Sequence, residues 1–404
     1  MLKSIGMEKV FIASVKDYSR DAVDSAVSQM FEYLGGAQNI IGVGKNVFIK
    51  INLVREMPPE KCGTTHPSIV RAVAQYLKNE CNANVVVGDS SGAPYNHAVM
   101  NAVYKTCGIK DACEQAGVAL NQDFGSATEY VDGKRVRMLD IIDVFTKADV
   151  VVNIGKLKTH SFTGFTGVVK NLYGLIPGLV KSQTHSLYPD LDGFTDCLVD
   201  IERYASKKIV LHILDAVMGM EGSGPTNGQP RYIGKLIAGK NPYLVDVAGV
   251  SFFANPSDMP LVIKAKKRGL LPDDLSDTGI DFDEIKSQRI PDYKTVKVLN
   301  TDFNKKGVFR RLLKREWVTQ KPKISAKRCK GCAKCYSHCP RQAIEMRSAK
   351  NGKRHARIIS KKCIRCYCCQ ELCPFDAVDL KKPFLYRAMK VFNGSSDKKG
   401  RKKD

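Results

Sequence analysis

Two cysteine-rich boxes near the C-terminus constrain this chain more than any other feature. Each box reads C-x-x-C-x-x-C-x-x-x-C-P, and the two occupy residues 329–340 and 363–374. Three thiolates at this spacing can wrap one face of an iron–sulfur cubane, while the fourth lies on the following turn and reaches a second cluster. A structural zinc site needs one set of four ligands and no proline after the last cysteine. The spacing therefore predicts two [4Fe–4S] clusters.

The predicted ligand sets are interleaved between the boxes. One cluster is expected on Cys329, Cys332, Cys335 and Cys373. The other is expected on Cys363, Cys366, Cys369 and Cys339. Neither cluster needs an open coordination position, so the pair predicts an electron relay of the bacterial two-cluster ferredoxin kind. Cys368 does not fit the cysteine spacing of its box and is expected to be a packed thiol. The pair Asn351-Gly352 between the boxes predicts a β-hairpin.

The remaining cysteine usage and the N-terminus predict a cytoplasmic protein. Fourteen cysteines in a chain without an export signal indicate metal ligation, because the cytosol keeps thiols reduced. The opening MLKSIGMEKVFIASVKDYS has no long apolar segment or small-residue cleavage site, and no later stretch is long enough to span a bilayer. Clusters that oxygen can reach also indicate an anaerobic host.

Short runs rich in Val and Ile alternate with helical patterns ahead of the boxes. Predicted strands are VFIASV, NVFIKINL, NVVVGDSS, DVVVNIG, KIVLHILDA and KLIAGK. Predicted helices cover residues 21–34, 67–81, 96–107 and 192–205. Several strands are apolar throughout, which is typical of strands buried on both faces. The pattern predicts an α/β domain with a mostly parallel sheet and helices on both faces, followed by a small ferredoxin-like α+β domain.

Composition divides the chain into four predicted segments. They are an α/β domain at 1–305, a basic linker at 306–324, a two-cluster ferredoxin domain at 325–385 and a basic, disordered tail at 386–404. The formal net charge is +23, and the excess lies near the C-terminus. Such charge attracts an acidic redox protein, such as an acidic ferredoxin or flavodoxin, although a merely solvated surface is the plain alternative. No aromatic residues interleave with the basic ones as a nucleic-acid platform needs, so nucleic acid is the less favoured partner.

Polar side chains follow three of the predicted strands. Asp89, Ser90 and Ser91 follow one strand, Lys156 to His160 follow another, and Asp215 ends a third. Ligands of open α/β sheets bind at the carboxyl ends of the strands, so we expect a site here. The glycine-rich segment 156–196 should let backbone approach an anion, with counter-charge from Lys156, Lys158, Lys170 and Lys181. The alternative is a long surface connection.

Three residues are the predicted catalytic candidates. His66 and His160 could act as acid or base near neutral pH, and Lys170 could bind a phosphate or form an adduct. The alternative for His66 is that it caps the helix that follows it. The alternative for His160 and His185 is that they are hydrogen-bonded surface histidines.

Several motifs together resemble the domain-of-unknown-function family 362. They are KINLV, THPSIVRAV, VVVGDSSG, KLKTHSFTGFTGVVKNLYGLIPG and GMEGSGPTNGQPR. The resemblance covers residues 7 to 300, and it implies an iron–sulfur or ferredoxin-like protein, because members often carry a C-terminal ferredoxin module. The family supplies no reaction.

A more local stretch is similar to the nickel-pincer lactate racemase family. His160, the run 164–167, Lys170, the Pro-Gly pair at 177–178 and His185 follow the order of that family's motif. The likeness implies that Lys170 and His185 bind a cofactor and that His66, in GTTHP, is a second catalytic base. Val168 and Val169 stand where that family has paired glycines.

Three functions remain open at this point. The favoured one is an electron-transfer protein that passes electrons to or from its own α/β domain or a docked partner. The second is a reductase or isomerase that acts on a small anionic substrate at 156–196, with a second, unidentified cofactor for which a nickel-pincer-like group is one candidate. As a reductase, the protein would be an oxidoreductase. The third is a basic nucleic-acid-binding or assembly factor.

Overall fold

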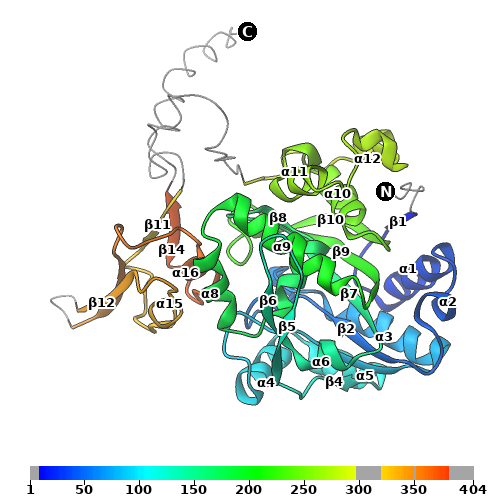
Figure 1. Cartoon of the computed structure of the whole chain (residues 1–404), viewed down its shortest axis with the longest axis horizontal. Coiled ribbons are helices and arrows are strands. Elements are labelled where there is room, and N and C mark those ends of the chain that lie inside the picture. The colour runs from blue at the N-terminus through cyan, green and yellow to red at the C-terminus, as the bar shows by residue number, and fades with distance from the viewer. Residues whose placement is uncertain (1–8, 297–319, 349–351, 382–404) are drawn as a thin grey trace, which may run out of the picture. The chain divides into compact units, whose positions relative to one another are not determined.

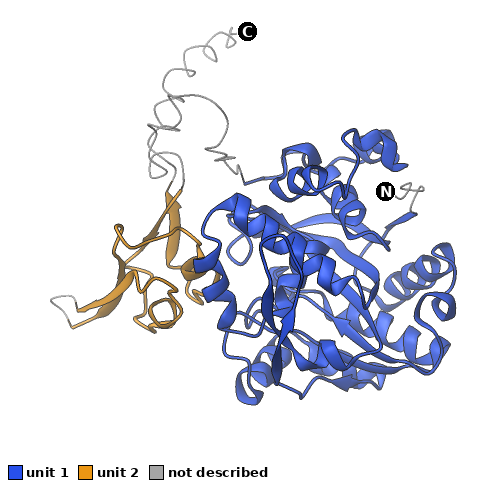
Figure 2. Ribbon diagram, viewed as in Figure 1, with its two compact units in different colours: residues 1–298 blue, residues 299–404 orange. Residues whose placement is uncertain are grey.

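The chain divides into two compact units, residues 1–298 and 299–404, as Figure 2 shows. The computed structural model describes residues 9–296, 320–348 and 352–381. Most of the expected basic linker and all of the expected C-terminal tail lie outside the described residues. Within the described ranges, no helix combines the length and the apolar character that a bilayer crossing needs.

A mixed sheet organises unit 1, with strand order β1-β10-β9-β7-β2-β3-β4 and β8 added to β7. The strands are β1 Val10–Ser14, β2 Asn46–Lys50, β3 Asn84–Gly88, β4 Ala119–Leu120, β7 Val150–His160, β8 Gly164–Thr166, β9 Ile209–Glu221 and β10 Gln229–Gly239. The run β9-β7-β2-β3-β4 is parallel, whereas β1, β10 and β8 pair antiparallel. The predicted α/β class is confirmed, with an antiparallel edge added to the parallel core.

Helices cover both faces of this sheet (Figure 1). They are α1 Arg20–Tyr33, α2 Ala37–Ile41, α3 Pro67–Cys81, α4 His97–Thr106, α5 Ile109–Ala116, α6 Asp143–Lys147, α7 Val168–Asn171, α8 Val180–Leu187, α9 Leu191–Ala205, α10 Pro242–Ser251, α11 Pro260–Lys267 and α12 Phe282–Ser287. Helices α1, α3 and α5 pack together on one face, and α7, α9, α10 and α11 pack together on the other. A separate hairpin joins β5 Ser126–Tyr130 to β6 Met138–Ile142.

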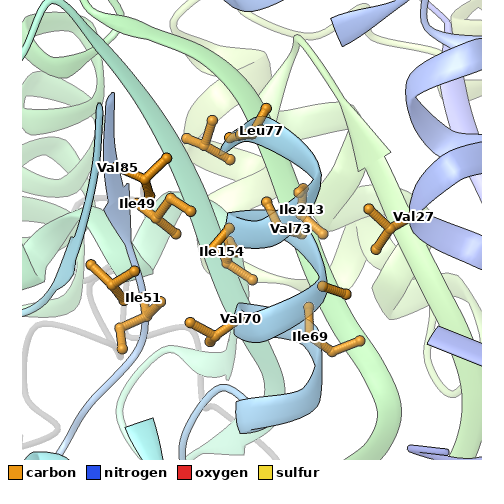
Figure 3. Packing of buried hydrophobic residues seen from close by; sticks show 14 of the residues in the cluster. Val27, Ile49, Ile51, Ile69, Val70, Val73, Leu77, Val85, Ile154 and Ile213 are labelled. Atoms are coloured by element: carbon orange, nitrogen blue, oxygen red, sulfur yellow. The ribbon is translucent and has the colours of Figure 1, made fainter. Parts of the chain in front are cut away.

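The core beneath α3 shows why this face folds as it does. Apolar residues at helical spacing, Val70, Val73 and Leu77, are all fully buried (Figure 3). They pack against Ile49 of β2 and Ile154 of β7. Pro67 occupies the first turn, where its missing N–H costs no helix bond. Burial of each such side chain stabilises the fold by about 1.5–3 kcal/mol.

Unit 2 is built from two similar halves. Strand β11 (Lys321–Ile324) pairs with β14 (Val378–Lys381), and β12 (Ile344–Ser348) pairs with β13 (Arg354–Ile358). Each cysteine box contains a short helix, α15 (Lys334–Ser337) or α16 (Cys368–Glu371). The residue after the second cysteine of each box, Ala333 or Tyr367, has a positive φ of 60° or 64°. The predicted hairpin between the boxes is confirmed by the β12–β13 pairing, although Asn351 lies outside the described residues.

Candidate functional site

The first predicted cysteine set lies together in unit 2. The pKa of Cys335 is raised to about 11 by burial and then by its neighbours Cys373, Cys329 and Cys332. Backbone N–H groups point at two of these sulfurs, from Ala356 to Cys329 at 3.5 Å and from Ala377 to Cys373 at 3.3 Å. Such N–H···S contacts are the kind that hold and tune iron–sulfur clusters.

The second predicted set lines one cavity. Its walls include Cys339, Cys363, Cys366 and Cys369 together with Ile344, Ile358 and Tyr367. Burial raises the pKa of Cys369 well above its usual value, and Cys366, Cys363, Cys335 and Cys339 raise it further. Because Cys335 belongs to the other set, the two sets adjoin. The N–H of Ala343 donates to the Cys339 sulfur at 3.2 Å.

The donor chemistry of both sets fits iron–sulfur clusters. All eight side chains are thiols, and the last cysteine of each box, Cys339 or Cys373, accepts a backbone N–H from the turn that follows it. Among the residues that the structure describes, no three His, Cys, Asp or Glu side chains are close enough to share one metal ion. That finding does not bear on a cubane, whose ligands are separated by the cluster itself. Cys368 is buried, and a hydrogen bond with Cys366 raises its pKa well above the usual value.

The carboxyl edge of the unit 1 sheet carries two buried ion pairs. The first joins the Lys50 ammonium to Asp89 Oδ1 at 2.7 Å, and the N–H of Leu53 donates to Asp89 Oδ2 at 2.6 Å. Burial lowers the pKa of Lys50 and raises the pKa of Asp89. Next to this pair, the Lys181 ammonium donates to Ser90 Oγ at 2.8 Å, and burial lowers its pKa to about 7.

The second ion pair joins Lys156 of β7 to Asp215 of β9 at 2.8 Å. The Tyr18 hydroxyl donates to Asp215 Oδ1 at 2.7 Å and accepts from the Lys156 ammonium at 2.8 Å. The His66 backbone N–H donates to Asp215 Oδ2 at 3.0 Å, and the His66 ring stacks on Tyr18 with centroids 3.5 Å apart. Four segments that are far apart in sequence therefore meet at one buried charge pair.

An amide network connects Lys158 to the Lys50 of the first pair. Its ammonium donates to Asn52 Oδ1 at 2.7 Å and to the Gly63 carbonyl at 2.5 Å. Asn52 in turn donates to Asn171 Oδ1 at 2.9 Å, and the Lys50 ammonium lies 3.3 Å from the same oxygen. Of the lysines expected to supply counter-charge, Lys156, Lys158 and Lys181 thus bond within this edge, and Lys50, which the sequence did not indicate, joins them.

The two histidines proposed as acid or base are both held by backbone. His66 caps α3, because its Nδ1 accepts from the Ser68 N–H at 3.2 Å. Burial lowers the pKa of His66 to about 4. His160 ends β7 and is 1% exposed, and its Nδ1 accepts from the N–H groups of Phe162 at 3.1 Å and Thr163 at 3.3 Å.

Lys170 and His185 meet around one aromatic ring. The Lys170 ammonium lies 5.8 Å from the centroid of Tyr173, and the ring of His185 lies 5.5 Å from the same centroid. His185 also stacks on Phe194 at 4.4 Å. His160 and His185 are both buried, so the surface-histidine alternative is wrong for them.

The segment 156–196 is not a surface connection. Residues 156–169 are buried throughout, because β7 continues to His160, turns and pairs with β8. The sequence did not indicate Tyr18 as a site residue. It lies 197 residues from its partner Asp215, and the residues around it form no recognisable motif. Asn171 is another such residue, although its place just after Lys170 was a usable signal.

Comparison with known proteins matches both units to families. Residues 47–251 match the family described as domain of unknown function (DUF362), and residues 328–377 match the 4Fe-4S dicluster domain. The thylakoid-associated protein sll1697 of Synechocystis sp. is 28% identical over 268 residues, which cover 66% of this chain and 81% of that protein.

Two solved structures are distantly similar. The lactate racemase apoprotein from Thermoanaerobacterium thermosaccharolyticum is 14% identical with a TM-score of 0.39, covering 62% of this chain and 60% of that one. A Thermotoga maritima protein is 14% identical with a TM-score of 0.33, covering 59% of each chain. This chain thus spans less than two thirds of either structure, and neither likeness carries a functional argument.

Proposed function

The chain belongs to the family of the domain of unknown function DUF362, and because that name supplies no reaction, we propose from its own residues that it transfers electrons through two [4Fe–4S] clusters. One cluster is held by Cys329, Cys332, Cys335 and Cys373. The other is held by Cys363, Cys366, Cys369 and Cys339.

The single observation that carries this proposal is that the eight thiols gather as the box spacing requires. Cys335 has Cys373 from the other box among its close neighbours, and Cys339 lines the cavity of the second set. Because Cys335 and Cys369 are also neighbours, an electron has a short path between the centres. The backbone N–H donors at Cys329, Cys339 and Cys373 would stabilise the added negative charge of reduced clusters.

The partner we favour is an acidic redox protein, such as a ferredoxin or flavodoxin. The net charge of +23 would speed its encounter with this chain, an effect that rising salt screens. We place the protein in the cytoplasm of an anaerobic host. The Synechocystis relative is named for association with thylakoids, and that name is a statement about the relative alone.

The test compares two adjacent cysteines in anaerobically purified protein. Wild-type protein should contain about eight irons and eight acid-labile sulfides per chain. Cys369→Ser should lose the iron of one cluster, because it removes a ligand of the second set. Cys368→Ser is the matched control and should keep the wild-type content. Equal losses in the two variants, or about four irons in the wild type, would contradict the assignment.

A reductase acting on a small anionic substrate is the second function we propose, and the electron relay would supply it. It is favoured by the carboxyl edge of the unit 1 sheet, where Lys50, Lys156 and Lys158 are each at most 1% exposed. Buried ionisable groups with specific charge partners concentrate at functional sites. The nucleic-acid alternative gains no support from the described residues, since the basic tail lies outside them.

A further inference from the structure

We propose that an acidic one-electron carrier protein docks on the surface of unit 2 formed by the first cysteine box, and that electrons enter and leave the chain through the cluster held by Cys329, Cys332, Cys335 and Cys373. This docking surface deepens the proposed electron-transfer function and rests on that function. Two boxes with the same cysteine spacing differ in exposure and in charge, and both differences favour the first box.

The two cluster sites differ in how far their thiols reach solvent. All eight ligand cysteines lie within the described residues, and among them Cys332 alone is exposed. The second set lines a cavity that the buried ring of Tyr367 helps to wall. In the first box the equivalent position holds Ala333, with the same left-handed backbone conformation and a much smaller side chain. Because electron transfer between proteins weakens steeply with distance, the first cluster is the better placed for a partner.

Exposed lysines lie on both sides of the exposed ligand. Lys330 and Lys334 flank Cys332 along the chain, Lys327 precedes the box, and all three are exposed. No acidic residue occurs from 325 to 344. The ion pairs among the described residues of unit 2 join Arg328 to Asp379 and Arg347 to Glu345, so these three lysines have no carboxylate partner there.

A neighbouring strand adds a fourth cation to this surface. A Cβ added at Gly331 would lie 2.7 Å from the carbonyl oxygen of Arg354, so the loop between Cys329 and Cys332 packs directly against the start of β13. The N–H of Ala356, two residues further on, donates to the Cys329 sulfur. Arg354 is exposed. Two segments of unit 2 therefore bring positive charge to the first cluster.

The second box does not have such a surface. Between its first and third cysteines the one cation is Arg365, which is buried. Acidic residues follow at Glu371 and Asp376, and the exposed lysines Lys361 and Lys362 lie ahead of the box. The charge beside the second cluster is therefore mixed, whereas the charge beside the first has one sign.

The composition of the first surface fits an acidic protein. Tyr336 of α15 is 51% exposed next to Lys334, and exposed tyrosines are enriched where proteins bind each other. A typical interface covers about 800 Å² of each partner, so residues 327–336 fit within one such area. Single-stranded nucleic acid needs a series of aromatic rings for its bases, and this segment has one. Carboxylates of a partner would complement the lysines and speed the encounter.

The transfer is an exchange of one electron. The electron leaves a reduced [2Fe–2S] centre of the partner, which is thereby oxidised, and reduces the cluster at the first box. No bond forms or breaks, and no proton has to move. Because Cys335 and Cys369 are neighbours, the electron can pass on to the second set.

The first experiment reverses two charges beside each box in the full, anaerobically purified chain. Lys330→Glu with Lys334→Glu alters the docking surface, and Lys361→Glu with Lys362→Glu makes the same charge change beside the second box. The rate constant for reduction by an acidic [2Fe–2S] ferredoxin would be measured at about 0.1 M salt, where charges more than about 10 Å apart are largely screened. The first variant should be slowed about 10-fold or more, and the second at most about 3-fold.

Two outcomes of this comparison would overturn the proposal. Equal slowing of the two variants would mean that net charge, and not a docking surface, governs the encounter. An unchanged rate in the first variant would exclude the surface outright. Lys330→Gln with Lys334→Gln removes the same charges without reversing them, and it provides the test if the glutamate variant loses iron.

The second experiment reads the position of the partner without electron transfer. Carbodiimide joins lysines to carboxylates, so treatment of the wild-type chain with oxidised ferredoxin should link Lys330 or Lys334 to it, as located by mass spectrometry. Links confined to Lys361 and Lys362 would overturn the proposal. So would a DNA duplex that binds more tightly than the ferredoxin and loses affinity in the first variant.

Iron content and reduction by the methyl viologen radical report separately on the electron relay. Both charge variants should keep about eight irons. Viologen is a small cation, so it should reduce them at least as fast as the wild type. A wild type that lacks these irons, or that viologen does not reduce, would contradict the electron-transfer function. Intact clusters with unslowed reduction by ferredoxin in the first variant would contradict the docking surface alone.

Discussion

Replacing Asp215 with Asn should destabilise unit 1 by about 3–5 kcal/mol, because it leaves the Lys156 charge buried without its partner. Lys156 is 1% exposed and Asp215 is 0% exposed, and their charged atoms lie 2.8 Å apart. At an effective dielectric constant of about 20, two charges at this distance attract by about 6 kcal/mol. The carboxylate also accepts from Tyr18 and from the His66 N–H, and an amide can replace only part of these bonds.

An upper limit follows from the option of neutralising the lysine. Releasing the proton of a lysine with a pKa of about 10.4 at pH 7 costs about 4.6 kcal/mol, and it removes the uncompensated charge. The loss of unfolding free energy in Asp215→Asn should therefore be no more than about 5 kcal/mol. Asp215→Leu combined with Lys156→Met should be less destabilised than Asp215→Asn alone, because it removes both charges together.

The assay is anaerobic urea unfolding followed by far-UV circular dichroism. Asp111→Asn is a matched control, because the same chemical change at an exposed position of α5 should alter stability by less than about 0.5 kcal/mol. An Asp215→Asn protein within 1 kcal/mol of the wild type would refute the reasoning. A double variant no more stable than Asp215→Asn would show that lost packing, and not charge, sets the cost.

Two further predictions concern other buried groups of unit 1. Burial lowers the pKa of His212 to about 3. Between pH 6.5 and pH 3 the unfolded chain therefore binds the proton more readily than the folded chain, and the free energy of unfolding falls as the pH falls. His212→Asn should reduce this pH dependence by at most about 1.4 kcal/mol per pH unit, as measured by urea unfolding at pH 6.5 and 4.5. Gly167→Ala should cost about 1–3 kcal/mol in the same assay, because its methyl group would collide with the Asp246 carboxylate that caps α7.

Most of the secondary structure could be predicted from the sequence because its signals are local. The strands beginning at Val10, Asn46, Asn84, Val150 and Ile209 each contain a short run rich in Val and Ile near their start, and such runs are typical of buried strands. The hairpin of unit 2 follows from two extended stretches around a turn pair in the same way. The cysteine grouping was predictable too, since cluster geometry fixes the spacing of its ligands along the chain.

The candidate site of unit 1 was predictable only in part. The strand-end rule located Asp89, Lys156 and Asp215 at one edge, because parallel strands bring their carboxyl ends together. It could not find Tyr18, which arrives from the segment after β1 and is recognised only through its bonds to β7 and β9. The hydrogen bonds of His160 were also beyond the sequence, because they come from two amides whose direction is set by a turn.

The buried lysines of this edge are difficult to explain as devices for stability. Replacing a buried ion pair with packed apolar residues is often neutral or stabilising, so Lys50 with Asp89 and Lys156 with Asp215 gain the fold little over an apolar edge. The same strands are largely apolar ahead of this edge, as residues 47–49 of β2 and 85–87 of β3 show, so the fold has no general need for charge here. Local departures from the packing rules concentrate where a protein acts. Two costly ion pairs at the one edge where α/β sheets bind ligands therefore favour a functional site there over a purely structural role.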